Sequence, residues 1–256
     1  MTKIWTVAIN TLKEAVRNKV LYTLLFFGVI VSGLSMTLAT MTIADRLRII
    51  ANVGLGNIEI FGTLIAIFVG INLVHKEMDR RTIFTIITRP IRRYEFILGK
   101  YLGLILTLLV EISFMVAIFY ALVIYYGGAE HLLDYTKSIW LIFVQIALIT
   151  SIATLFSSLS SPILSGMFTL AFYIIGSISS YLEMLATLDV GGAAIMLLAI
   201  MRHLLPDFSF FNIKGAVLYG REVSFDYMFS ATAYGFFYIA LVLAIAIIIF
   251  EKRDMK

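Results

Sequence analysis

The chain has 256 residues, of which 61% are hydrophobic and only 14% are charged. Soluble domains carry about 25% charged residues, so this composition excludes an ordinary soluble protein and indicates a chain embedded in lipid. The net charge of +4 would suggest nucleic-acid binding in a soluble protein, but here the basic residues cluster beside apolar segments. The chain has no cysteine, which excludes disulfides, thiolate metal sites and thiol catalysis.

The first segment, residues 1–19, is amphipathic. Trp5, Ile9, Leu12 and Val16 recur at helical spacing, with charged residues between them. This pattern predicts a helix that lies in the membrane interface with an aromatic residue near its start. Its last turn is equally compatible with a cytoplasmic extension of the first span.

Six apolar segments are then candidates for membrane spans, which need about 20 residues each. We predict spans over residues 20–40, 58–74, 98–126, 138–156, 163–185 and 228–250. The second span is short and has Glu59 at its outer edge; an earlier start near Asn52, with an interruption at Gly54 and Gly56, is the alternative. The predicted fold class is an all-α integral membrane protein, with one transmembrane domain over residues 1–256.

Residues 186–227 form an insert between the last two spans. Its apolar patch, residues 192–201, is too short to cross a bilayer. We therefore expect a short interfacial or re-entrant helix outside the membrane. A seventh span is the alternative, and it would move the C-terminus to the other side.

The distribution of Lys and Arg predicts the orientation, because cytoplasmic loops are enriched in these residues. With six spans, fourteen of them fall on one side and six on the other. Both termini and residues 75–97 are then cytoplasmic, and the insert is extracytoplasmic.

The densest run of charge lies in the cytoplasmic segment 75–97. Read as a helix, it places Met78, Ile83 and Ile86 near one face, and Pro90 would end that helix. A plain positive-inside loop with snorkelling arginines explains the basic residues. It does not explain the amphipathic helix, the proline or the acids mixed with the bases.

The cytoplasmic segment also carries a motif, Glu77-x3-Arg81-Thr82 followed by Pro90-x2-Arg93-x2-Phe96-x2-Gly99-Lys100. It resembles the region between spans two and three in permeases of the type 2 ATP-binding-cassette exporters. The run Thr11-x-Lys13-Glu14-x2-Arg17-x-Lys19 is similar to the interfacial connecting helix of that family. Within the family, the chain resembles the subgroup that includes the nitrous-oxide-reductase maturation permease.

This resemblance implies that a coupling helix between spans two and three sits in a groove of a cytoplasmic ATPase. Two permeases, identical or homologous, would pair with two ATPases, and ATP-Mg would bind to the ATPases. The implied coupling residues are Glu77, Asp79, Arg80, Arg81, Thr82, Pro90 and Arg93, and Gly99 and Lys100 would begin the third span. The chain has no G-x-x-x-x-G-K-[ST] loop, so we expect no cofactor on it and no enzymatic activity of its own.

Polar residues inside the predicted spans are the remaining candidates. Glu111 lies near the middle of span three, where a carboxylate is costly unless it is paired, protonated or hydrated. With Gln145 and Glu183 it forms a candidate translocation path. The alternatives are bundle packing for Glu111, an interhelical hydrogen bond for Gln145 and snorkelling for Glu183. The three histidines fall in different segments, which predicts no metal site.

The predicted function is a permease that exports a hydrophobic or amphipathic substrate across a prokaryotic cytoplasmic membrane. Two alternatives remain. One is a non-transport role, in which ATP-driven motion acts on a partner during protein maturation. The other is an ion-coupled carrier that uses Glu111. The expected partners are the ATPase, a second permease and the lipid bilayer, and we expect no nucleic acid.

Overall fold

The computed structural model describes residues 3–40, 46–79, 92–186 and 206–252, and within residues 72–79 and 179–186 it describes the helical course alone. All regular elements in these ranges are helices, which confirms the predicted all-α class. They are α1 (Lys3–Val16), α2 (Lys19–Thr40), α3 (Arg46–Asp79), α4 (Arg93–Tyr125), η2 (Ala129–His131), α5 (Leu132–Leu159), α6 (Pro162–Ala186), η3 (Phe208–Phe211), α8 (Lys214–Leu218) and α9 (Phe225–Lys252).

Five of these helical stretches are long and apolar enough to cross a membrane. They are Lys19–Thr40, Arg46–Ile71, Arg93–Tyr125, Ala129–Leu159 and Phe225–Lys252. Helix α6 has 25 residues, and its portion Pro162–Ile178 is apolar but shorter than a span. The part of the chain with described side chains thus supports a multi-pass membrane protein, and the six-span topology stays a prediction.

Helix α3 differs most from its predicted span. It begins at Arg46 instead of residue 58 and continues through Gly54 and Gly56 without interruption. A Cβ at Gly54 would lie 2.3 Å from Cδ2 of Phe119 on α4, so this glycine allows close helix packing and does not break the helix. Glu59 lies about 20 Å along α3 and is buried, so its predicted place at the outer edge of the span is wrong.

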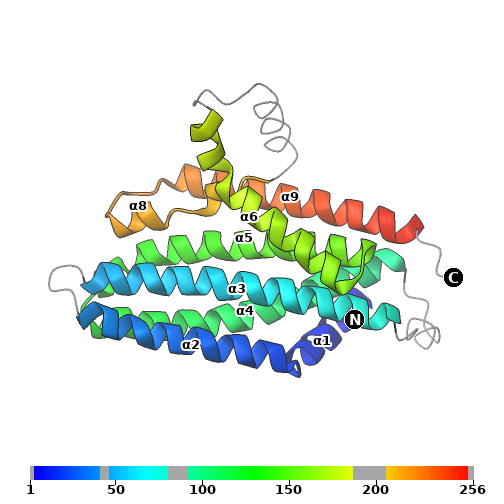
Figure 1. Ribbon diagram of the computed structural model, residues 1–256, viewed down its shortest axis with the longest axis horizontal. Coiled ribbons are helices and arrows are strands. Elements are labelled where there is room, and N and C mark those ends of the chain that lie inside the picture. Colours follow the sequence, from blue (N-terminus) through cyan, green and yellow to red (C-terminus); the bar gives the residue numbers. More distant parts are fainter. Residues whose placement is uncertain (1–2, 41–45, 80–91, 187–205, 253–256) are drawn as a thin grey trace.

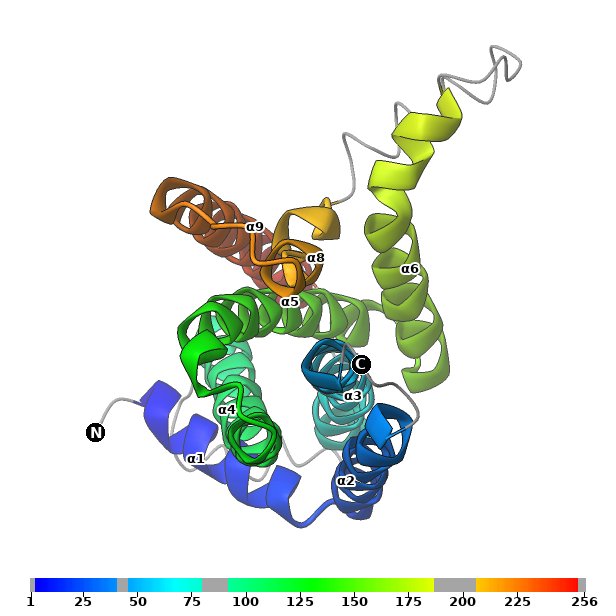
Figure 2. The ribbon, with the colours of Figure 1, turned by 90° about the vertical axis from the view of Figure 1, so that its left-hand side faces the viewer.

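Helices α3 and α5 form the centre of the bundle, as the end-on view in Figure 2 shows. In the most apolar stretch of each helix, the buried share is 78% for α5 but only 22% for α2. Helices α2, α4, α9 and α6 surround the central pair, and α6 diverges from the bundle toward its C-terminal end (Figures 1 and 2).

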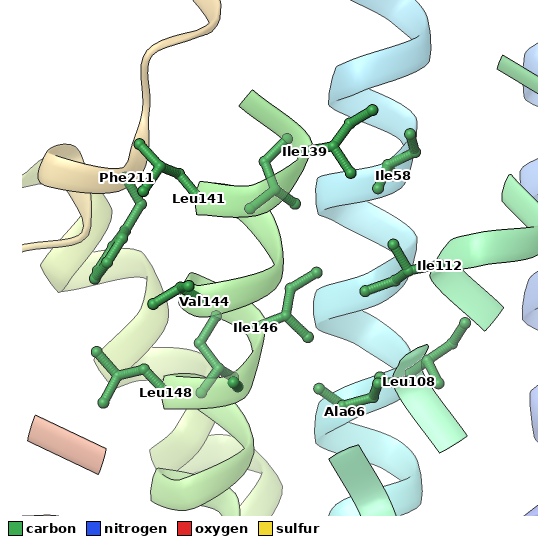
Figure 3. Packing of buried hydrophobic residues seen from close by; sticks show 14 of the residues in the cluster. Ile58, Ala66, Leu108, Ile112, Ile139, Leu141, Val144, Ile146, Leu148 and Phe211 are labelled. Atoms are coloured by element: carbon green, nitrogen blue, oxygen red, sulfur yellow. The ribbon is translucent and has the colours of Figure 1, made fainter. Parts of the chain in front are cut away.

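Branched apolar side chains interlock between the central helices (Figure 3). Ile58 and Ala66 of α3, Ile112 of α4 and Ile146 of α5 are all at most 4% exposed. A Cβ at Gly62 would lie 2.5 Å from Cδ1 of Ile146, so α3 and α5 approach closely here. Lipid is as apolar as these side chains, so close packing, rather than escape from water, stabilises such contacts.

The two ends of the bundle carry different elements (Figure 1). We call the end with α1, the start of α4 and the last turn of α9 the proximal end. The distal end carries η2, α8 and the start of α3. Under the predicted orientation the proximal end is cytoplasmic.

Candidate functional site

Helix α4 begins where the predicted coupling segment returns to the membrane. The backbone N–H of Arg92, the N-cap residue of α4, donates to Oε2 of Glu95 at 2.8 Å. Glu95 is the third residue of the helix, so this bond stabilises the helix start. Pro90, two residues before this cap, disfavours a helical conformation at the residue that precedes it. The local sequence therefore sets where α4 starts.

Arg93 joins the start of α4 to the end of α9. Its Nη1 donates to the carbonyl oxygens of Phe250 at 3.1 Å and Glu251 at 2.7 Å. The last carbonyls of a helix lack intrahelical partners and carry partial negative charge, so a guanidinium stabilises them. The rings of Phe96 and Phe250 stack with centroids 5.9 Å apart, which adds an apolar contact between the same two helices.

Helix α1 packs against α4 through small residues. A Cβ at Gly99 would lie 2.6 Å from Cβ of Val7, and one at Gly103 would lie 2.6 Å from the carbonyl oxygen of Ala8. On α1, the side chains of Ala8, Thr11 and Ala15 form the buried face. Gly99 thus permits a close approach of the two helix backbones, and Gly103 extends the contact by one turn.

The predicted apolar face of α1 faces away from this contact. Trp5 and Val16 are each 44% exposed, and Ile9 and Leu12 are half-buried. An interfacial helix requires an apolar face that is available to lipid, and this arrangement leaves one.

Lys100 is a buried cation in the α1–α4 contact. Its side chain is 1% exposed, and its Nζ lies 3.6 Å from Oε2 of Glu14 on α1. The same Nζ lies 5.9 Å from the centre of the Phe96 ring. A buried charge without such partners would be costly, so these contacts fix α1 against α4.

Arg93, Gly99, Lys100 and Gly103 together connect α4 to α1 and α9, and we call this set the proximal joint. Of the other predicted coupling residues, Glu77 and Asp79 belong to the last turns of α3, where the helical course alone is described. Arg80, Arg81, Thr82 and Pro90 lie outside the described residues.

A second polar group, the Glu59 cluster, lies inside the bundle. It consists of Glu59 on α3, Gln145 on α5 and Lys214 on α8. Nε2 of Gln145 donates to Oε1 of Glu59 at 3.1 Å, and Nζ of Lys214 forms an ion pair with Oε2 of Glu59. Both carboxylate oxygens are therefore bound, and the ion pair ties the insert between the last two helices to the centre of the bundle.

The insert is also held by α6. A Cβ at Gly176 would lie 2.5 Å from Cδ2 of Phe208 and 2.7 Å from the carbonyl oxygen of Pro206. Gly176 therefore allows α6 to pack closely against the insert.

The predicted path residues are not brought together among the described residues. Glu111 is 3% exposed, and neither of its carboxylate oxygens has a hydrogen-bond partner in the described part of the protein. Gln145 makes the interhelical hydrogen bond that its alternative interpretation predicts. Glu183 lies on α6 in the portion where the helical course alone is described.

Sequence reasoning missed two buried contacts. Nδ2 of Asn57 on α3 donates at 2.7 Å both to the carbonyl oxygen of Gly28 and to Oγ of Ser32 on α2. The other is the pairing of Lys214 with Glu59. A signal for that pairing exists, because Lys214 is the one base in the apolar stretch 208–219 and Glu59 is the one acid in span two.

A family model described as ABC-2 family transporter protein matches residues 5–255, which is nearly the whole chain. No curated protein matches the chain.

Proposed function

Because the chain belongs to the ABC-2 transporter family, and is thus a transmembrane permease, we propose that it is the membrane subunit of an exporter driven by a separate cytoplasmic ATPase. The substrate is hydrophobic or amphipathic, and ATP-Mg binds to the ATPase. The observation that carries the proposal is the family match over residues 5–255, on a chain whose described residues include five long apolar helices.

The proposal includes a topology. Six spans cross a prokaryotic cytoplasmic membrane, both termini and residues 75–97 are cytoplasmic, and the insert is extracytoplasmic. Two copies, or two homologous permeases, assemble with two ATPases. The distribution of basic residues supports this orientation. The membership in the nitrous-oxide-reductase maturation subgroup, and with it a non-transport role in protein maturation, stays a prediction.

The proximal joint supports a route for the force. The coupling segment, residues 75–97, runs from the end of α3 to the start of α4. A push on this segment reaches α9 through Arg93 and α1 through Gly99, Gly103 and Lys100. Packed contacts and charged hydrogen bonds move as a unit, so α1, α4 and α9 would respond together.

The test of this function is co-purification from native membranes. We expect tagged wild-type protein to retain an ATP-binding-cassette ATPase. In the double reversal Glu77→Lys/Arg81→Glu, the amount of ATPase retained should fall at least about tenfold, because mismatched charges at an interface oppose association. The matched control is Lys137→Glu at the distal end. Absence of an ATPase from the wild-type complex, or equal retention by both variants, would overturn the proposal.

The ion-coupled carrier remains a second candidate because of one observation, the buried and unpartnered carboxyl of Glu111. If Glu111 couples transport to an ion or a proton, Glu111→Gln should slow substrate movement at least about tenfold, because the amide of glutamine has nearly the shape of the carboxyl but neither carries a charge nor releases a proton. Expression and unfolding should stay normal. Transport assays in proteoliposomes measure this, and unchanged transport would assign Glu111 to bundle packing.

A further inference from the structure

A cavity of about 500 Å³ opens at the distal end of the bundle, away from the proximal joint. Its walls come from the first turn of α3, the turn between α4 and α5, and the end of α8. A volume of this size lies within the range of small-molecule and headgroup sites. Neither the ATPase coupling nor the Glu59 cluster makes use of it.

The walls of this cavity are cationic and aromatic. Arg46, Arg48 and His131 line it together with the rings of Tyr126, Tyr135 and Tyr219. The described lining residues include no Asp or Glu. Glu130 contacts the lining from outside: its Oε1 lies 3.5 Å from Nε2 of His131, and its side chain is 79% exposed.

The cavity has a buried apolar floor below its charged mouth. Tyr135 is 4% exposed and Val217 is 8% exposed, whereas the two arginines are exposed. The guanidinium of Arg48 lies 5.6 Å from the centre of the Tyr219 ring, which orients it. A ligand that fits this arrangement has an anionic oxygen group at the mouth and an apolar portion toward the floor.

The wall contributed by α8 is held in place from inside the bundle. Lys214 at the start of α8 pairs with Glu59, and residues 217–220 at its other end line the cavity. The α8 wall of the cavity is therefore anchored to the centre of the bundle. Under the predicted orientation, the two arginines also lie on the side of the membrane where basic residues are disfavoured, which indicates that they have a specific function there.

We propose that this cavity binds a phosphate group, with Arg46 and Arg48 as its ligands and the tyrosines as its walls. Guanidinium groups match phosphate oxygens through paired hydrogen bonds. The phosphate can come from an anionic phospholipid headgroup or from a soluble anion. The apolar floor favours the lipid, whose glycerol and upper chain would lie along Tyr135 and Val217.

The test uses the purified full chain and two probes. One is retention of phosphatidylglycerol against phosphatidylcholine, measured by native mass spectrometry after detergent exchange. The other is stabilisation against heat by inorganic phosphate in neutral detergent. The variant is Arg46→Gln/Arg48→Gln, and the matched control is Arg221→Gln, an exposed arginine near the same end that does not line the cavity.

We expect phosphatidylglycerol retention to fall at least about tenfold in the double variant and to stay unchanged in Arg221→Gln, since each charged hydrogen bond contributes about one power of ten in affinity. Phosphate stabilisation that depends on the two arginines, without selective lipid retention, would assign the site to a soluble anion. Two results would overturn the proposal: neither probe depending on these arginines, or equal losses in Arg221→Gln. The double variant should unfold at the wild-type temperature in phosphatidylcholine, and Tyr219→Leu provides a second variant that leaves the charges in place.

Discussion

Replacing Lys214 with methionine should destabilise the protein by about 3–5 kcal/mol, because it leaves the carboxylate of Glu59 buried without its cation. Glu59 is 8% exposed, and after the change its hydrogen-bond partners Gln145 and Tyr173 are neutral and do not replace the lost cation. The double variant Glu59→Gln/Lys214→Met removes both charges and should recover most of that loss. The free energy of unfolding in detergent micelles measures both effects.

The matched control for this prediction is Lys137→Met. Lys137 also forms an ion pair, with its Nζ 2.8 Å from Oδ1 of Asp134, but that pair is partly open to solvent and spans one helical turn. Exposed pairs contribute about 0–1 kcal/mol, so the control should lose little. If the single and double variants of the Glu59 cluster were equally destabilised, the ion pair would not be what ties the insert to the bundle.

Changing Gly103 to alanine should separate α1 from α4 and destabilise the protein by about 1–3 kcal/mol. The added Cβ would lie 2.5 Å from Cβ of Thr11 and 2.6 Å from the carbonyl oxygen of Ala8, and a backbone oxygen cannot move aside without shifting α1. The ATPase activity that the permease stimulates should also fall, because the proximal joint would no longer hold α1 against α4.

Gly33→Ala is the control, since a Cβ at Gly33 on α2 meets nothing within 4 Å. Alanine is favoured over glycine in a helix by up to about 1 kcal/mol, so this variant should gain stability. The two substitutions are chemically identical and should have opposite signs in unfolding measurements. A gain in stability for Gly103→Ala would show that α1 is not packed on α4 as described.

The helices themselves could be predicted from the sequence because length and hydropathy determine them directly. Uncharged runs such as residues 20–40 match α2 almost residue for residue. The start of α3 could not be found this way, since Asn52, Gly54, Gly56 and Glu59 look like breaks in an apolar run. All three are compatible with a long helix. Gly54 packs against Phe119 of α4, Glu59 pairs with Lys214, and Gly56 costs the helix only about 1 kcal/mol relative to alanine.

The candidate site was predictable only where its signal is local. Pro90 indicates a break before α4, but the helix begins at Arg93, five residues before the predicted span, and Gly99 and Lys100 lie in its second turn. Arg93 on the carbonyls of α9 and Lys214 on Glu59 join residues separated by more than 150 positions. One sequence contains no information on which distant helix end or carboxylate such a cation will meet, so these contacts required the structure.

The most direct test of the central claim, that force enters through residues 75–97, is site-specific cross-linking to the ATPase. The chain has no cysteine, so one introduced at Arg81 is the only thiol in the chain. In the assembled complex, a thiol-to-amine cross-linker should capture the ATPase from Arg81→Cys and not from Lys137→Cys at the distal end. Capture from Lys137→Cys, with none from Arg81→Cys in an intact complex, would contradict the claim.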